Sequence, residues 1–190
     1  MTDTSLSTPP FPAGARDPLL VAARVVVIFV TVIMAIAGAA LAVALPAIIV
    51  KRADIIAEMT AKGYDGAPGP VLAAAAGALL LGLVAVGIIM MFLRLLDRII
   101  GTVGAGEPFA AENATRLSQM GWLVLAVQAI GLPLAAIAAW LGKHADKLEG
   151  DFDVDIGFSG DGLVLALVLF ILARVFRHGA AMRAELEGTV

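Results

Sequence analysis

The sequence contains no cysteine, only two histidines and few charged residues. Without cysteine the chain cannot form disulfides, thiolate nucleophiles, iron–sulfur clusters or cysteine-type zinc sites. His144 and His178 flank an apolar stretch, so a membrane between them would prevent them from sharing a metal ion. The net charge of −3 and the pI of about 5.3 argue against direct binding of nucleic acid.

Hydrophobic residues, in contrast, are abundant. They make up 61% of the 190 residues, charged residues make up 15%, and the mean hydropathy is +0.97. Soluble proteins have about 45–50% apolar and about 25% charged residues. The excess lies in four long stretches, at about 25–50, 71–93, 120–142 and 158–177. We therefore expect an all-α polytopic membrane protein, a bundle of four transmembrane helices with short loops.

The domain organisation follows from these stretches. We expect a disordered cytoplasmic N-terminus over residues 1–18, a four-span membrane domain over 19–180 and a cytoplasmic tail over 181–190. A cleaved signal peptide is an alternative for the first stretch, because it contains many alanines. The stretch is longer than the usual apolar region of about 7–15 residues and follows a long N-terminal segment, so we interpret it as a span.

Two tryptophans are predicted to anchor the third span at the membrane interfaces. Trp122 and Trp140 are about 27 Å apart along a helix, close to the thickness of the hydrocarbon core. Tryptophan is enriched at both membrane–water interfaces. We therefore expect one of them at each end of the span.

Lysine and arginine residues beside the spans predict the orientation, because cytoplasmic loops carry an excess of them. Eight lie on one side: Arg16, Arg24, Arg94, Arg98, Arg116, Arg174, Arg177 and Arg183. Five lie on the other: Lys51, Arg52, Lys62, Lys143 and Lys147. Both termini are thus expected in the cytoplasm, as in a multi-pass protein of the inner membrane.

The spans contain few polar residues and several small ones. Thr31 and Gln128 are almost the only polar side chains, which disfavours a transport site at the membrane midplane. Small residues recur at a spacing of four, where they let helices approach closely: Ala74, Ala78, Gly82, Gly131, Ala135 and Ala139. We expect these residues to pack helices within the chain; a homo-oligomer or contact with another subunit is the alternative.

Two loops invite a more specific interpretation. The glycine-rich segment 101–106 lacks the Lys-Ser/Thr ending of a phosphate-binding loop, so we expect a linker before a helix that opens at 107–109, with Pro108 in its first turn. Asp151, Asp153 and Asp155 alternate with apolar residues, as in a short exposed strand. The alternative is a calcium loop, although the glycine comes at position 7 and not 6, and position 12 is Gly162 and not the glutamate of an EF-hand.

No set of residues indicates catalysis. The histidines have no candidate nucleophile nearby, and paired carboxylates occur only in the acidic loop. We therefore expect no enzyme activity, no catalytic residues and no cofactor, with the three aspartates as the only weak candidates for a metal site.

The last third of the chain resembles a known family. The residues of this chain that carry the resemblance are Arg174, Val175, Phe176, Arg177, Gly179 and Ala180, then Glu185, Glu187, Thr189 and Val190. A second similar pattern is Gly106, Pro108, Phe109, Glu112, Asn113, Arg116 and Leu117, running into Gly121, Trp122 and Leu123. Both are similar to the short bacterial four-span membrane proteins of the domain of unknown function 2975.

The resemblance implies a function through protein contacts. The family has no established activity or cofactor, and its members are often encoded beside a small helix-turn-helix regulator. This implies a membrane-bound regulator or anchor for a soluble partner, with no direct contact to nucleic acid. The residues expected to contact a partner are Pro108, Phe109, Glu112, Asn113, Arg116, Arg174, Phe176 and Arg177. An accessory subunit of a larger membrane complex is the alternative, and a small channel or transporter is a third that the spans disfavour.

Overall fold

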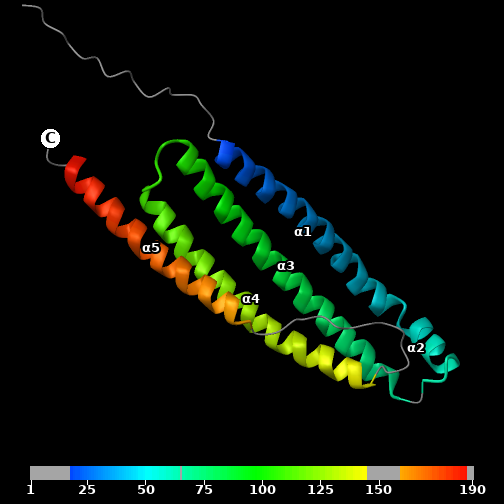
Figure 1. The fold of residues 1–190 in the computed structure, drawn as a ribbon. Coiled ribbons are helices and arrows are strands. Elements are labelled where there is room, and N and C mark those ends of the chain that lie inside the picture. The colour runs from blue at the N-terminus through cyan, green and yellow to red at the C-terminus, as the bar shows by residue number, and fades with distance from the viewer. Residues whose placement is uncertain (1–17, 65, 145–158, 188–190) are drawn as a thin grey trace, which may run out of the picture.

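The computed structural model describes residues 18–64, 66–144 and 159–187, and all of its regular structure in these ranges is helical. The helices are α1 (Pro18–Val50), α2 (Arg52–Ala61), α3 (Pro68–Gly104), α4 (Ala111–His144) and α5 (Gly160–Glu187) (Figure 1). By length and composition α1, α3, α4 and α5 can each cross a membrane. The prediction of an all-α, multi-pass membrane protein is therefore confirmed.

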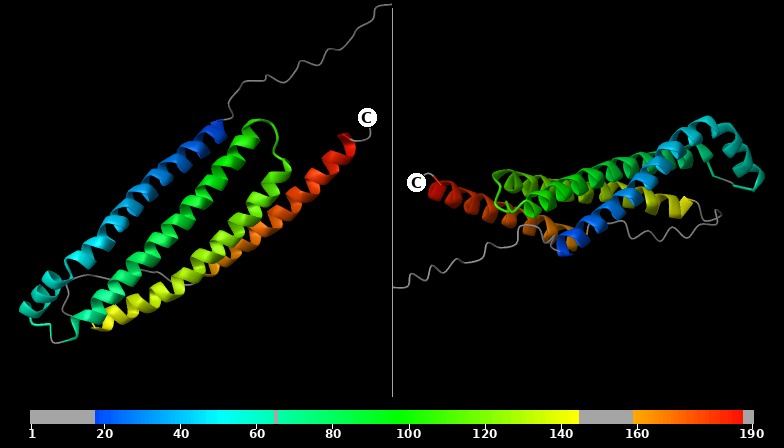
Figure 2. Two further views of the ribbon diagram at one scale, coloured as in Figure 1. Left: turned by 180° about the vertical axis from the view of Figure 1, so that it is seen from behind. Right: turned by 90° about the horizontal axis from the view of Figure 1, so that it is seen from above.

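The four long helices lie side by side in the order α1, α3, α4, α5, and each packs against the next (Figures 1 and 2). Among the described residues, α1 has no backbone contact with α4 or α5, and α3 has none with α5. The helices thus form an open row. Its outer surfaces carry large apolar side chains such as Phe29 and Ile36, 65% and 66% exposed, as expected for surfaces that contact lipid.

Each end of the row holds a hydrophobic cluster. We call the end with the loop between α3 and α4 (residues 105–110) the hairpin end and the other the α2 end. The hairpin-end cluster joins three helices through its buried residues Leu95, Leu117, Met120, Leu169 and Ala173. The α2-end cluster has Met59, Val71 and Leu72 at its centre, with Trp140 packed against them.

Helix α2 is not predicted by the apolar pattern, because it is short and only one side of it is apolar. α1 continues through Pro46 to Val50, and α2 starts after Lys51 and places Met59 against the first turn of α3. The Tyr64 hydroxyl donates a hydrogen bond of 3.0 Å to the carbonyl of His144 and so ties this segment to α4. On the exposed surface of α2, Lys62 lies 2.8 Å from Glu58, and this contact lowers the pKa of that carboxyl.

Two expectations about the segment between the second and third predicted spans, residues 101–110, are wrong. Gly101–Gly104 is the last turn of α3 and not a linker, and α4 begins at Ala111, so Pro108 lies in the loop rather than in the first helical turn. The reversal occurs at Gly106, whose φ of 81° is in the left-handed region that glycine adopts without steric cost. The Glu107 amide then donates to the carbonyl of Thr102, 3.0 Å away.

Helix α5 is displaced along α4 toward the hairpin end. The Gln128 amide, in the middle of α4, donates to the carbonyl of Ser159 at 2.7 Å, just before α5 begins. Gly162 in the first turn leaves room for Gln128, since a Cβ there would lie 2.5 Å from its side chain. The last turns of α5 consequently extend past the loop between α3 and α4 (Figure 1).

Candidate functional site

At the hairpin end, the loop between α3 and α4 packs against α5. The rings of Phe109 and Phe176 have their centroids 5.5 Å apart at 43°, and Phe176 also packs on the hairpin-end cluster. A Cβ on Gly179 would lie 2.8 Å from Cδ1 of Phe109, so the absence of a side chain at Gly179 leaves room for the ring of Phe109. Two segments that are far apart in the sequence therefore form a single surface.

Apolar side chains continue this surface along α5. Met182 and Leu186 follow Gly179 by about one and two turns, on the same side of the helix, and are 51% and 73% exposed. Phe109 is 44% exposed and Glu112 is also exposed, whereas Pro108 is half-buried. We define the hairpin surface as Phe109, Glu112, Met182 and Leu186. The sequence analysis did not identify Met182 and Leu186, although their spacing on one helix face is visible in the sequence.

Asn113, expected to contact a partner, lies inside the protein with no exposed surface. Its Nδ2 donates to Oγ1 of Thr102 at 2.8 Å and to the carbonyl of Pro108 at 3.0 Å. Its Oδ1 accepts from Nη1 of Arg116 at 2.8 Å. In this structure Asn113 therefore holds the loop in place and orients Arg116, and it cannot touch a partner.

Arg174 and Arg177 lie away from the Phe109–Phe176 contact, in a cleft of about 620 Å³ between α4 and α5. His178 and Ser118 line this α4–α5 cleft with them, and Phe170 lies toward the middle of the helices. Within the part of the chain that the structure describes, neither arginine forms an ion pair. The expected partner-contact residues thus belong to different environments: the hairpin surface, the Asn113 network and this cleft.

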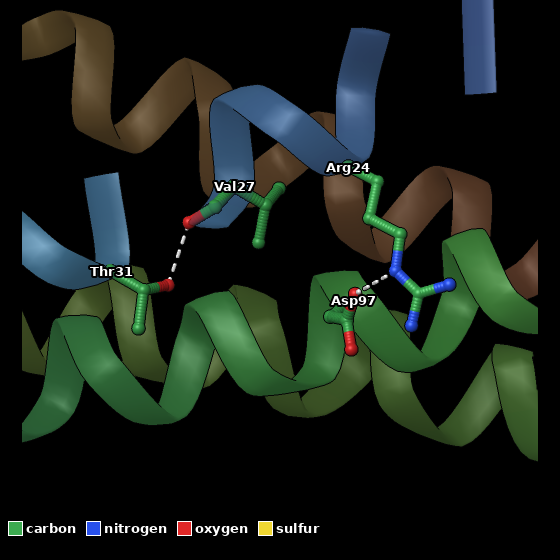
Figure 3. Close-up of polar contacts among 4 residues, drawn as sticks. All are labelled: Arg24, Val27, Thr31 and Asp97. Atoms are coloured by element: carbon green, nitrogen blue, oxygen red, sulfur yellow. Dashed lines mark hydrogen bonds and ion pairs between the residues drawn. The ribbon is translucent and has the colours of Figure 1, made fainter. Parts of the chain in front are cut away.

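A second cleft, of about 430 Å³, lies between α1 and α3 near the hairpin end. Figure 3 shows its ion pair, in which Nε of Arg24 is 3.5 Å from Oδ1 of Asp97. Arg94 and Arg98 also line it, and Thr31 donates its hydroxyl to the carbonyl of Val27 in its own helix, at 2.7 Å. The sequence analysis missed this pair, because nothing local connects residues on different helices.

Two glycines of α3, the predicted Gly82 and the neighbouring Gly77, lie in van der Waals contact with other helices of the same chain. A Cβ on Gly82 would lie 3.5 Å from Leu41 of α1, and one on Gly77 would lie 3.8 Å from Ile137 of α4. The other residues expected to pack helices are half-buried, apart from the exposed Ala139: Ala74, Ala78, Gly131 and Ala135. Close approaches at Gly38 and Gly121 were not anticipated.

The two tryptophans have different surroundings. Trp122 is 66% exposed and meets the ring of Phe170 edge-on, at 5.5 Å and 71°. Trp140 packs on the α2-end cluster and stacks on His144, with 4.3 Å between the ring centroids. Trp122 is therefore the one with a wide surface available to lipid.

Among the described residues, no group of three or more histidine, aspartate or glutamate side chains could hold a metal ion. The candidate calcium ligands Asp151, Asp153 and Asp155, and the strand proposed for them, lie outside the described residues.

Comparison with known protein families gives a match over most of the chain. The model of a family described as "Protein of unknown function (DUF2975)" matches residues 50–190, which contain α2 to α5 and both segments of the hairpin surface. No curated protein and no solved structure matches the chain.

Proposed function

Because the chain belongs to the DUF2975 family of proteins of unknown function, we propose a function from its structure: a non-enzymatic inner-membrane protein that holds a soluble protein at its hairpin end. The observation that carries the proposal is the contact between Phe109 and Phe176. It joins the loop and α5 into one surface, on which a partner can contact both segments at once.

The apolar part of the hairpin surface supports a protein partner. Met182 and Leu186 follow Gly179, which lies against Phe109, along the end of α5, and all three apolar side chains are exposed. Exposed apolar patches outside a membrane are typical of interaction sites. A small helix-turn-helix regulator is the partner that the family resemblance implies, held through protein contacts and not through DNA.

The distribution of cationic residues supports a cytoplasmic location for this end. The described residues of the hairpin end include seven arginines: Arg24, Arg94, Arg98, Arg116, Arg174, Arg177 and Arg183. The α2 end includes four basic residues: Lys51, Arg52, Lys62 and Lys143. An excess of lysine and arginine is typical of the cytoplasmic side.

Affinity capture of the tagged, full-length protein in mild detergent tests the proposal. The double variant Met182→Ser/Leu186→Ser should lower recovery of the soluble partner by about tenfold, since few residues dominate most interfaces. The control is Leu19→Ser/Val21→Ser, which changes two exposed apolar residues of α1 at the same end. The proposal would be contradicted if the two double variants recovered equal amounts of the soluble partner.

An accessory subunit of a larger membrane complex is the second candidate, and the open row favours it. Val27 is the only described residue of α1 that is buried, so most of this helix is available to another membrane protein. The contact of Gly82 with Leu41 argues against Gly82 as part of such a contact site, because this residue already packs against α1 of the same chain. Stoichiometric membrane subunits in the same capture experiment would support this candidate.

A further inference from the structure

We propose that the α4–α5 cleft binds the phosphate headgroup of an anionic phospholipid. This site is separate from the hairpin surface and does not depend on the soluble partner. Arg174 and Arg177 come from successive turns of α5, His178 follows Arg177 directly, and Ser118 lines the same cleft from α4. Arginine guanidinium and serine hydroxyl groups are donors that phosphate oxygens accept.

The charge of the cleft favours an anion. None of the described residues that line it is acidic, and neither Arg174 nor Arg177 forms an ion pair within the described part of the chain. The cleft between α1 and α3 differs, because Asp97 lies there beside Arg24. The α4–α5 cleft therefore has cationic groups without a counter-charge from the described protein.

The position of the cleft along the axes of α4 and α5 favours a lipid as the source of the phosphate. Trp122 and Phe170 pack edge-on, and Trp122 is widely exposed, as expected for a side chain at the membrane interface. Ser118 and Arg174 each lie about one turn, or about 6 Å, from this aromatic pair toward the hairpin end. Cationic groups just outside an interfacial tryptophan are at the level of lipid phosphates.

The cleft also changes from apolar to cationic along its length. Phe170 and Ala173 line the part nearer the middle of the helices, whereas Arg177 and His178 line the part nearer the hairpin end. A phospholipid has the same sequence of groups, from acyl chain to phosphate. Basic pockets between membrane-spanning helices are known to hold anionic headgroups.

The two tryptophans provide a direct measurement. Trp140→Phe leaves Trp122, which packs on Phe170 of the cleft, as the single tryptophan of the chain. This full-length protein is placed in lipid nanodiscs, and quenching of Trp122 fluorescence is compared between brominated phosphatidylglycerol and brominated phosphatidylcholine. We expect half-maximal quenching at about a tenfold lower mole fraction of the anionic lipid.

Three variants on this background test the assignment. Arg174→Gln/Arg177→Gln should remove the preference for the anionic lipid while quenching by phosphatidylcholine stays the same, which also shows that Trp122 keeps its place. Arg174→Lys/Arg177→Lys should retain the preference, because the charge is kept. Arg94→Gln/Arg98→Gln removes two exposed arginines of the other cleft at the same end and should also retain it.

Equal quenching by both lipids, or a preference that survives Arg174→Gln/Arg177→Gln, would overturn the proposal. Excess inorganic phosphate in the buffer distinguishes the source of the phosphate group. If it leaves the preference unchanged, the lipid assignment is supported. If it abolishes the preference, the cleft binds soluble phosphate and the lipid assignment is wrong.

Discussion

Phe109, in the loop between α3 and α4, packs its ring against Phe176 of α5 with 5.5 Å between the centroids. Gly179, about one turn further along α5, makes this contact possible by leaving the space that a Cβ would fill. The contact fixes the position of the displaced α5 against the loop. The hairpin surface depends on it, since without it the loop and the end of α5 would be independent segments.

The first prediction concerns the space at Gly179. In Gly179→Val the side chain would meet Phe109 at 2.8 Å, so we expect a loss of stability of about 1–3 kcal/mol, as is typical of overpacking. Thermal unfolding in detergent measures it. The control Gly87→Val adds the same side chain to the same kind of helix where no atom lies within 4 Å. Equal melting temperatures for the two variants would contradict the packing shown.

The second prediction concerns the buried amide of Asn113. Asn113→Leu removes the partner of Thr102, of the Pro108 carbonyl and of Arg116, and leaving buried polar groups unpaired costs about 1–3 kcal/mol. The melting temperature in detergent should fall accordingly. Gln119→Leu, at an exposed position of the same helix, is the control. A stability unchanged from wild type would show that the network does not hold the loop.

The third prediction concerns the ion pair between Arg24 and Asp97. Their side chains are 63% and 43% exposed, and exposed pairs contribute about 0–1 kcal/mol. We therefore expect Asp97→Asn to change the free energy of unfolding by less than about 1 kcal/mol. Chemical denaturation in detergent measures this change, and a loss well beyond that bound would mean that the pair is desolvated in the membrane.

The fourth prediction concerns orientation, and the absence of cysteine makes it simple to test. Ala57→Cys places a thiol on the exposed side of α2, and Glu112→Cys places one at the hairpin end. A membrane-impermeant maleimide added to intact spheroplasts should label the first and not the second, and should label the second in inverted vesicles. The reverse pattern would place the hairpin surface outside the cell.

Much of the architecture could be predicted from the sequence. The spans expected at 25–50, 71–93 and 120–142 all lie inside α1, α3 and α4, because a long uncharged stretch has few alternatives to a membrane helix. Helix α2 and the displacement of α5 could not be predicted. Both depend on contacts between segments that are distant in sequence, such as Tyr64 with His144 and Gln128 with Ser159.

The candidate site was predicted in part. The sequence analysis selected the loop and the end of α5, and the structure brings Phe109 and Phe176 together. It also grouped Arg174 and Arg177 with Phe176, although residues 174 and 177 lie on a different side of a helix from residue 176. The burial of Asn113 could not be predicted, because it depends on how the chain turns at Gly106.

The central claim is that the loop and the end of α5 hold one soluble partner together. Site-specific photo-cross-linking in native membranes tests it most directly, with a photoreactive amino acid at Phe109, at Leu186 or, as a control at the same end, at Val21. We predict that Phe109 and Leu186 cross-link to the same soluble protein and that Val21 does not. Cross-links from Phe109 and Leu186 to different proteins, or to lipid alone, would contradict the account.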